Sequence, residues 1–180
     1  MTISPYWVQI NEATLRQGDY LPGCLVPIPV FDPTTFGQKD NETKDVQIRI
    51  KEFDLIVVTQ SCDLDNKKVN QVILCPIFPI MEYEEVNPAF AKKGRWNHVL
   101  KGRTEGLHML ASPENPENNR EALVVDLRQI YTLPYEYLLK HATDLGSRWR
   151  LKSPYLEHFS QAFARLFMRV GLPSSIPPFS

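Results

Sequence analysis

The sequence predicts a single α+β domain, with antiparallel strands first and helices last. Short runs of β-branched and aliphatic residues, separated by segments rich in Asn, Asp, Gly and Pro, occupy most of the chain before residue 130. Two helical patterns follow these runs. With 180 residues, 43% of them hydrophobic, the chain is long enough for one core that buries roughly 70% of the unfolded surface.

The amino-terminal part, residues 5–31, is expected to hold a strand and its partner strand. The second of these contains three prolines, Pro22, Pro27 and Pro29. Because proline removes a backbone donor, this strand fits the edge of a sheet or the rim of a barrel. A polar loop is expected over 32–45, and the apolar/polar alternation over 46–50 indicates a half-exposed strand.

A central β-hairpin is predicted next. Residues 55–58 and 72–74 are aliphatic and β-branched runs typical of strands. Between them, residues 61–70 supply Asp and Asn side chains that hydrogen-bond their own backbone in turns. We interpret residues 79–106, which are loosely helical in spacing, as an insertion that caps one end of the domain. Two further paired strands are expected over 107–110 and 122–127, joined by an exposed loop.

The carboxy-terminal helix has the strongest pattern. Ser153 can cap its start, Pro154 suits its first turn, and Gly171 followed by Pro173 can end it. An apolar stripe at helical spacing, which predicts a buried face, comprises Tyr155, Leu156, Phe159, Phe163, Leu166, Phe167 and Val170. A shorter helix is expected from Pro134 to His141, with Leu138 and Leu139 facing inward.

Composition excludes several function classes. The net charge of −1 gives no bulk attraction to nucleic acid or membrane, so a nucleic-acid site must be a local patch. The sequence shows no secretion signal and no apolar run of about 18 residues, which predicts a cytoplasmic protein without a membrane partner. Three cysteines, with no pair in CxxC spacing, argue against a disulfide framework or a zinc site. We expect no metal and no cofactor.

Four segments share their order with a known family: RQGDY at 16–20, TQSCD at 59–63, VILCPI at 72–77 and VVDLRQIYTL at 124–133. With the long final helix, they resemble the MazF/PemK-type toxins of the CcdB/PemK superfamily, whose chains open with a GD strand, carry a QND-like turn and end with a QIRT-like step into helices. The likeness spans most of the chain outside 79–121, through short motifs.

The resemblance implies a small SH3-like barrel over residues 1–180, with the insertion at 79–106, and a homodimer. It also implies a growth inhibitor that binds or cuts single-stranded RNA without a metal, and that is paired with an antitoxin. The family cuts RNA with an Arg and a Thr or Ser. Here Glu52-Phe53-Asp54 stands in place of that Arg, and Asn70 or Gln71 in place of the Thr.

Metal-free RNA cleavage needs a base, an acid and a cation for the phosphate. The central turn offers Gln60, Ser61 and Asp63, and the resemblance adds Arg16. Asp65 is a second carboxylate, and Lys67 and Lys68 are candidate RNA-binding cations. The structural alternative is that the aspartates stabilise a turn and the lysines stay solvated.

Cys62 is a candidate nucleophile if a histidine lies within hydrogen-bond reach, because a neighbouring base must stabilise the thiolate. His108 and His158 are the candidate partners. The alternative is a small buried cysteine at a strand end. Cys24 and Cys75 lie in apolar strands and are expected in the core.

Two basic segments are candidate contacts for a polyanion. Lys92, Lys93, Arg95 and Trp96, followed by Lys101 and Arg103, could bind single-stranded RNA, with Trp96 stacking on a base. Alternatively this run is a solvated loop with Trp96 anchored in the core. The second is a stripe of Arg165 and Arg169 on the final helix, which could be an internal ion-pair ladder with Glu157. If the stripe instead points outward with Arg148 and Arg150, which lie between the two predicted helices, it would be a surface for phosphate or a partner.

These features leave three functional hypotheses. The first is a toxin-like protein that binds or cleaves single-stranded RNA. The second is a non-catalytic module for protein or nucleic acid on the same barrel, which holds a protein partner through residues 79–106. The third is a cysteine hydrolase centred on Cys62.

Overall fold

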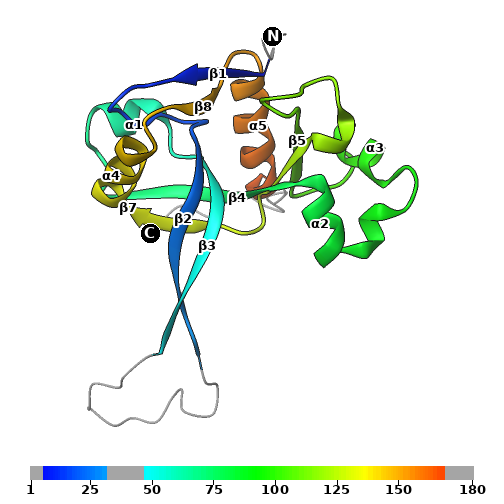
Figure 1. The fold of residues 1–180 in the computed structure, drawn as a ribbon, viewed down its shortest axis with the longest axis horizontal. Coiled ribbons are helices and arrows are strands. Elements are labelled where there is room, and N and C mark those ends of the chain that lie inside the picture. The colour runs from blue at the N-terminus through cyan, green and yellow to red at the C-terminus, as the bar shows by residue number, and fades with distance from the viewer. Residues whose placement is uncertain (1–5, 32–46, 169–180) are drawn as a thin grey trace, which may run out of the picture.

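The computed structural model describes residues 6–31 and 47–168 (Figure 1). Its strands are β1 (Trp7–Ile10), β2 (Tyr20–Pro29), β3 (Ile48–Val57), β4 (Gln71–Pro79), β5 (Leu107–Leu110), β6 (Leu123–Asp126), β7 (Tyr131–Pro134) and β8 (Arg148–Leu151). Its α-helices are α1 (Ser61–Asp65), α2 (Ile80–Val86), α3 (Arg95–Leu100), α4 (Tyr135–Leu145) and α5 (Tyr155–Phe167), and two 3₁₀ turns are η1 (Pro88–Ala91) and η2 (Asn119–Glu121).

The strands pair antiparallel in two sheets. One follows the order β2-β3-β4-β6-β5, with β7 also pairing with β4, and the other is β1 with β8. The long β4 therefore connects the sheet, pairing β3 and β7 through its first part and β6 through its last residues. This arrangement confirms the α+β class and the central hairpin. The SH3-like barrel stays a prediction, since the pairings among the described residues follow an open path.

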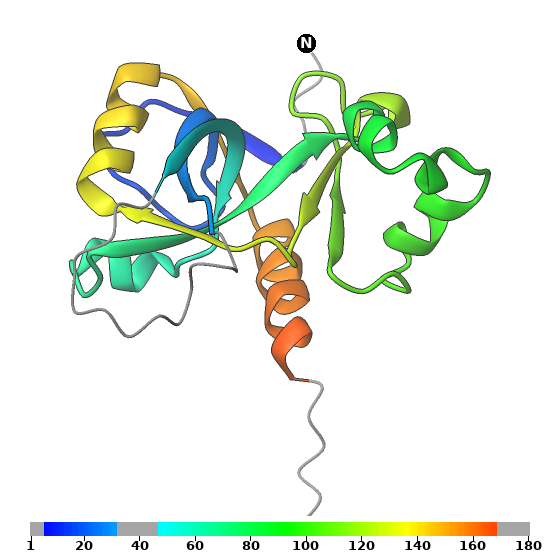
Figure 2. The same ribbon diagram turned by 90° about the horizontal axis from the view of Figure 1, so that it is seen from below.

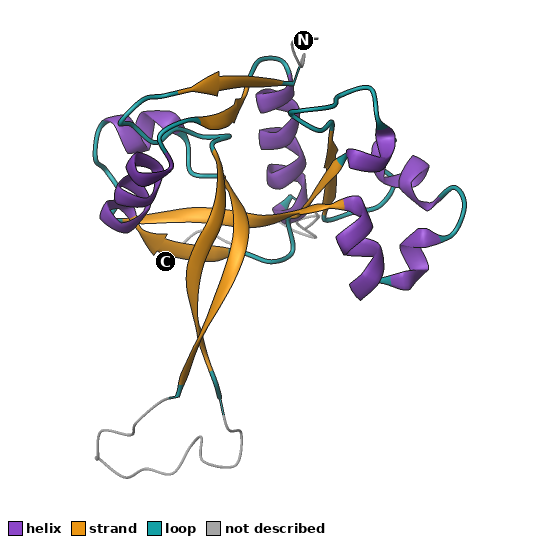
Figure 3. Ribbon diagram, in the orientation of Figure 1, coloured by secondary structure: helices purple, strands orange, loops and turns teal. Residues whose placement is uncertain are grey.

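The outer halves of β2 and β3 project from the body as a two-stranded ribbon (Figures 1 and 3). Residues 48–52 are exposed along their whole length, with Ile48 and Ile50 59% and 61% accessible. A strand is present from Ile48, as predicted, but the expected half-exposure is wrong, since every side chain from 48 to 52 is exposed. The polar loop expected over 32–45 lies outside the described residues.

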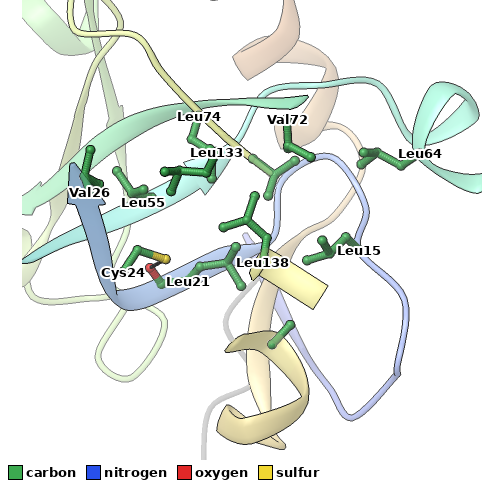
Figure 4. Packing of buried hydrophobic residues seen from close by; sticks show 12 residues of the cluster. Leu15, Leu21, Cys24, Val26, Leu55, Leu64, Val72, Leu74, Leu133 and Leu138 are labelled. Carbon is green, nitrogen blue, oxygen red and sulfur yellow. Dashed lines mark hydrogen bonds between the residues drawn. The ribbon is translucent and has the colours of Figure 1, made fainter. Parts of the chain in front are cut away.

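The hydrophobic core consists of three clusters. The first joins β2, β3, β4 and β7 to α4, and Figure 4 shows its side chains pointing toward one another. The second packs the final helix α5 against β1, β8 and the middle of the sheet, and the third lies under the insertion. Cys24 and Cys75 are fully buried in the first and second clusters, as predicted.

The amino-terminal strand has a different partner from the one expected. β1 pairs with β8, and Trp7 lies opposite Leu151, both of them buried. The sequence placed residues 148–150 between two helices and predicted no strand there, because a four-residue strand is too short to show a clear alternation. Helix α4 also continues beyond the predicted end at His141, to Leu145.

The final helix confirms the predicted apolar face in its described part. Phe159 is fully buried, and Tyr155, Leu156, Phe163 and Leu166 pack against the second cluster. Phe167 is the exception, with 58% of its surface exposed. The helix begins after Pro154, with no side-chain cap, so the expected Ser153 cap is wrong. Val170, Gly171 and Pro173 lie outside the described residues.

The insertion at 79–106 is helical, as its spacing indicated: α2, η1 and α3 lie at one side of the sheet (Figure 3). β4 continues to Pro79 before α2 begins at Ile80. The central connection differs from the expected turn, because Ser61–Asp65 forms the short helix α1. Its one buried residue, Leu64, anchors it to the first core cluster.

Candidate functional site

The structure brings the Arg16 loop and helix α1 together. The backbone amide of Gln17 donates to Ser61 Oγ at 3.1 Å, and Arg16 Nη2 lies 3.6 Å from Asp65 Oδ2. Lys68 Nζ lies 3.6 Å from Asp63 Oδ1. Of the predicted catalytic residues, Arg16, Ser61 and Asp63 therefore share one surface. Gln60 precedes the helix without capping it, and Lys67 is exposed at a left-handed position with φ of 51°.

The ion pairs of this surface are solvent-exposed. The Arg16 and Asp65 side chains are about half exposed, and Lys68 is more exposed still. Exposed pairs of this kind contribute only about 0–1 kcal/mol, and Arg16 and Lys68 are each matched by a carboxylate. This arrangement fits the structural alternative, in which the aspartates hold the turn. Catalysis by these residues stays a prediction.

Cys62 is exposed rather than buried at a strand end. Its Sγ approaches Gln60 Oε1 at 3.7 Å and Asp63 Oδ1 at 3.8 Å. The two candidate histidines lie elsewhere, since His108 is in β5 and His158 in α5. Figures 1 and 2 place α1 and β5 on opposite sides of the molecule, and the partners of the Cys62 thiol among the described residues are Gln60 and Asp63, so the structure does not support the Cys–His pairing required for a cysteine hydrolase.

Both histidines instead line one hollow of about 570 Å³, which we call the histidine hollow. It lies where β5 and the segment following α3 face helix α5. Its polar lining includes Lys101, Thr104 and Glu105 before β5, His108 in β5, and His158, Gln161 and Arg165 on α5. Sites that hold small ligands have volumes of roughly 300–1,000 Å³, so this hollow is large enough for one.

Each of the two imidazoles lies beside an aromatic ring. The His108 ring lies 5.9 Å from the buried Phe159 ring, and the exposed His158 meets Tyr155 edge to face at 6.3 Å. Burial, and then the nearby His158, lower the pKa of His108 to about 4. His108 is therefore uncharged near neutral pH, while Lys101 and Arg165 make the lining positive against the single carboxylate of Glu105.

The arginines of the second basic segment have different environments. Arg148 is fully buried and pairs with the buried Asp19, and Arg150 pairs with Asp19 and Glu12. The outward phosphate surface is therefore wrong for these two residues, because their guanidinium groups are already paired with the buried Asp19 and, for Arg150, also with the exposed Glu12. Arg165 is exposed and lines the histidine hollow. Arg169 lies outside the described residues.

Trp96 is anchored within the insertion. Its Nε1 donates to Glu84 Oε1 at 2.7 Å, and its ring lies 5.2 Å from Phe90 and 5.9 Å from Tyr83. Arg120 makes two hydrogen bonds to the same Glu84 carboxylate. The structural alternative for Trp96 is thus confirmed. The three cations near it, Lys92, Lys93 and Arg95, are exposed.

Sequence reasoning did not group the residues of the histidine hollow. It considered the two histidines only as partners of Cys62, and placed Lys101 and Arg165 in separate basic segments. One signal was present: His158, Gln161 and Arg165 follow one another at three and four residues, so they share a helix face. Their proximity to Lys101 and His108 depends on the packing of α5 against the sheet.

Two further properties hold over residues 6–31 and 47–168. No group of three or more His, Cys, Asp or Glu side chains is arranged to hold a metal ion. None of the described helices has both the length and the apolar character needed to cross a membrane. Comparisons with protein-family models, curated proteins and solved structures each gave no match, so the resemblance to MazF/PemK-type toxins stays a prediction.

Proposed function

We propose that this protein binds single-stranded RNA, with the sugar-phosphate chain held in the histidine hollow. The observation that carries this proposal is the convergence of Lys101 and Arg165 on one hollow that also contains two imidazoles. These residues come from segments far apart in the sequence. Lysine and arginine supply the phosphate attraction on which single-strand binding mainly rests.

The surrounding charge supports the same assignment. Lys92, Lys93 and Arg95 are exposed on the segment that leads into Lys101. A strand leaving the hollow could therefore continue over further cations. The whole chain has a net charge of −1, so RNA affinity has to come from a local surface of this kind. Trp96 contributes by holding the insertion in place, since its indole donor is already used by Glu84.

We also propose that the strands form a barrel and that the protein is cytoplasmic. An antiparallel bridge between Asp19 and Arg150 joins the β1–β8 sheet to the start of β2, which supports a curved, barrel-like arrangement of these strands. That arrangement is the one implied by the resemblance to MazF/PemK-type toxins, which act on RNA in the cytoplasm.

The test is fluorescence anisotropy of a short labelled single-stranded RNA at increasing salt. We expect affinity to fall with salt, and Lys101→Gln and Arg165→Gln each to weaken binding and lower the salt slope by about 0.7–1. Lys140→Gln removes a charge from the exposed face of α4, away from the hollow, and should bind like the wild type. Equal affinity in all four proteins, or no binding by any, would contradict the proposal.

A second candidate function, a protein-interaction module, is favoured by the projecting ribbon. One face of the ribbon carries Leu25, Pro27 and Pro29 opposite Glu52, Ile50 and Ile48. Leu25, Ile48 and Ile50 are each at least half exposed. A two-stranded ribbon is marginally stable alone, and exposed apolar faces of this kind are usually covered by a partner. A protein partner such as an antitoxin could cover this face, and we consider a second copy of the chain in detail.

A second copy suits this face because Glu52, at its base, is the one charged side chain among those six residues. Two such faces can therefore meet without like-charge contacts. Light scattering after gel filtration should give a dimer for the wild type and a monomer for the Leu25→Ser/Ile50→Ser variant. A wild-type monomer at high concentration would reject this candidate.

A further inference from the structure

We propose that the histidine hollow also cleaves the RNA that it holds, with His108 as the base and His158 as the acid. This inference rests on the proposed RNA binding. It moves the chemistry from the α1 surface, where Arg16 and Lys68 are paired with carboxylates, to a site with two imidazoles and two cations. The substrate class is single-stranded RNA with a free 2′-hydroxyl at the cleaved position.

The geometry provides two imidazoles on different elements of one hollow. His108 comes from β5, where its backbone pairs with Val125, and His158 comes from the first half of α5. Phe159, fully buried beside His158 in the chain, packs against the His108 ring and ties the two elements together. General acid–base catalysis needs two such groups on different elements of one site, because each ring must reach a different oxygen of the same phosphodiester.

The two rings differ in environment, which assigns their roles. His108 is the more enclosed ring, and burial keeps it uncharged, so it begins the reaction able to accept a proton. A phosphodiester bound beside it adds negative charge, which favours the imidazolium that forms during the reaction. His158 is the exposed ring of the lining, so it can reach a leaving oxygen and bulk water.

Charged groups around the rings complete the site. Lys101 faces the hollow from the segment after α3, and Arg165 faces it from α5. Both can stabilise the extra negative charge that develops on the phosphate oxygens as the 2′-oxygen attacks. Glu105 is the one carboxylate of the lining, and it lies on the same segment as Lys101.

The step balances without any further reactant. Uncharged His108 takes the proton of the 2′-hydroxyl, and the 2′-oxygen forms a bond to phosphorus. The bond from phosphorus to the 5′-oxygen breaks, and protonated His158 gives its proton to that leaving oxygen. The products are a 2′,3′-cyclic phosphate and a 5′-hydroxyl end. Proton exchange with water then restores both histidines.

The experiment incubates the full-length protein with a labelled single-stranded RNA and with a copy that lacks one 2′-hydroxyl. We expect cleavage of the RNA into fragments ending in a 2′,3′-cyclic phosphate, and no cut at the deoxy position. His158→Gln should reduce the cleavage rate by about 100-fold or more and leave RNA affinity within a few-fold, since the lost group acts in proton transfer. His108→Asn should also abolish cleavage.

His98→Gln is the matched control, because His98 is an exposed histidine of α3 that is not part of the hollow's lining. It should cleave at the wild-type rate, whereas loss of cleavage in His158→Gln purified in the same way excludes a contaminating nuclease. If His108→Asn fails to fold, as judged by circular dichroism, His158→Gln still tests the proposal, because His158 is exposed and its replacement should not disturb the core. RNA that is bound but never cut, or cut equally by His158→Gln, would overturn this inference and leave RNA binding standing. Absence of binding would overturn both.

Discussion

Asp19 and Arg148 form an ion pair that is completely buried, with Arg148 Nη2 3.0 Å from Asp19 Oδ2. The two residues are 129 positions apart, so the pair fixes β8 to the segment that enters β2. Arg148 Nη1 also donates to the backbone oxygen of Glu12 at 2.8 Å, and Arg150 donates to the other oxygen of Asp19. One carboxylate thus holds two arginines of a short edge strand.

Asp19→Asn should therefore be strongly destabilising. Removing the carboxylate leaves the guanidinium of Arg148 buried without a counter-charge, which costs about 3–5 kcal/mol of unfolding free energy. Urea denaturation followed by tryptophan fluorescence measures this loss. Asp144→Asn, which breaks the exposed pair with Lys140 on α4, is the control and should cost no more than about 0.5 kcal/mol. Similar losses in both variants would show that the buried pair is not needed for stability.

This ion pair marks the limit of prediction from the sequence. The strands at 55–58 and 72–74 and the helix α5 were predicted because their patterns are local and periodic. Asp19 was noticed only as part of a GD motif, and Arg148 and Arg150 only as basic residues between helices. Their burial depends on contacts between distant segments. A charged residue in a sequence is read as exposed until its partner is known.

Gly18 supplies the next prediction, because its backbone is left-handed and closely packed. Its φ is 82°, and a Cβ there would lie 2.9 Å from Leu156 Cδ1 and 3.0 Å from Leu151 Cβ. Gly18→Ala should combine left-handed strain of about 1–2 kcal/mol with an overpacking cost of about 1–3 kcal/mol. The difference in unfolding free energy between Gly18→Ala and wild type measures the sum of these two costs.

The Gly94→Ala variant separates the cost of the left-handed strain from the cost of overpacking. Gly94 has a similar φ of 87°, but a Cβ there would have no neighbour within 4 Å. Its cost should be the strain alone, so Gly18→Ala should be clearly the more destabilising variant. Equal costs would mean that Leu151 and Leu156 move aside freely.

The histidine hollow could not be predicted from the sequence for a related reason. His108 and His158 are 50 positions apart, and nothing in the spacing indicates that β5 faces α5. By contrast, the proximity of Arg16 to helix α1 was expected from the motif order and is present. The order of the sequence motifs predicted that Arg16 and α1 share a surface. The histidine hollow depends instead on how the final helix α5 packs against the sheet.

The three cysteines should differ sharply in reactivity. Cys62 is exposed, while Cys24 and Cys75 are buried, and burial raises the pKa of each of these two thiols to about 12. Because the thiolate is the reactive form, a disulfide reagent should label one thiol in the native protein and all three in denaturant. Cys62→Ser should leave the native protein unlabelled. Rapid labelling of that variant would show that a buried cysteine opens to solvent.

Asp126 should make stability depend on acid pH. Burial alone would raise the pKa of this carboxyl, but the hydrogen bonds from Arg128 and Gln129 outweigh burial and lower it. Arg128 Nε and Nη2 each donate at 2.8 Å, and Gln129 Nε2 donates at 3.1 Å. In the unfolded chain an aspartate has a pKa of about 3.9. The ionised form is therefore favoured by the folded state.

The sign of the effect follows from that lowered pKa. The stabilisation from Asp126 is complete above about pH 4, the unfolded value, and it is lost as the pH falls through the lower folded pKa. Asp126→Asn should thus be less stable than wild type near neutral pH, and the gap should narrow as the pH drops from about 4 towards 2. Urea midpoints over that range measure the gap. A constant gap for Asp126→Asn would show that its hydrogen bonds do not favour the ionised carboxylate.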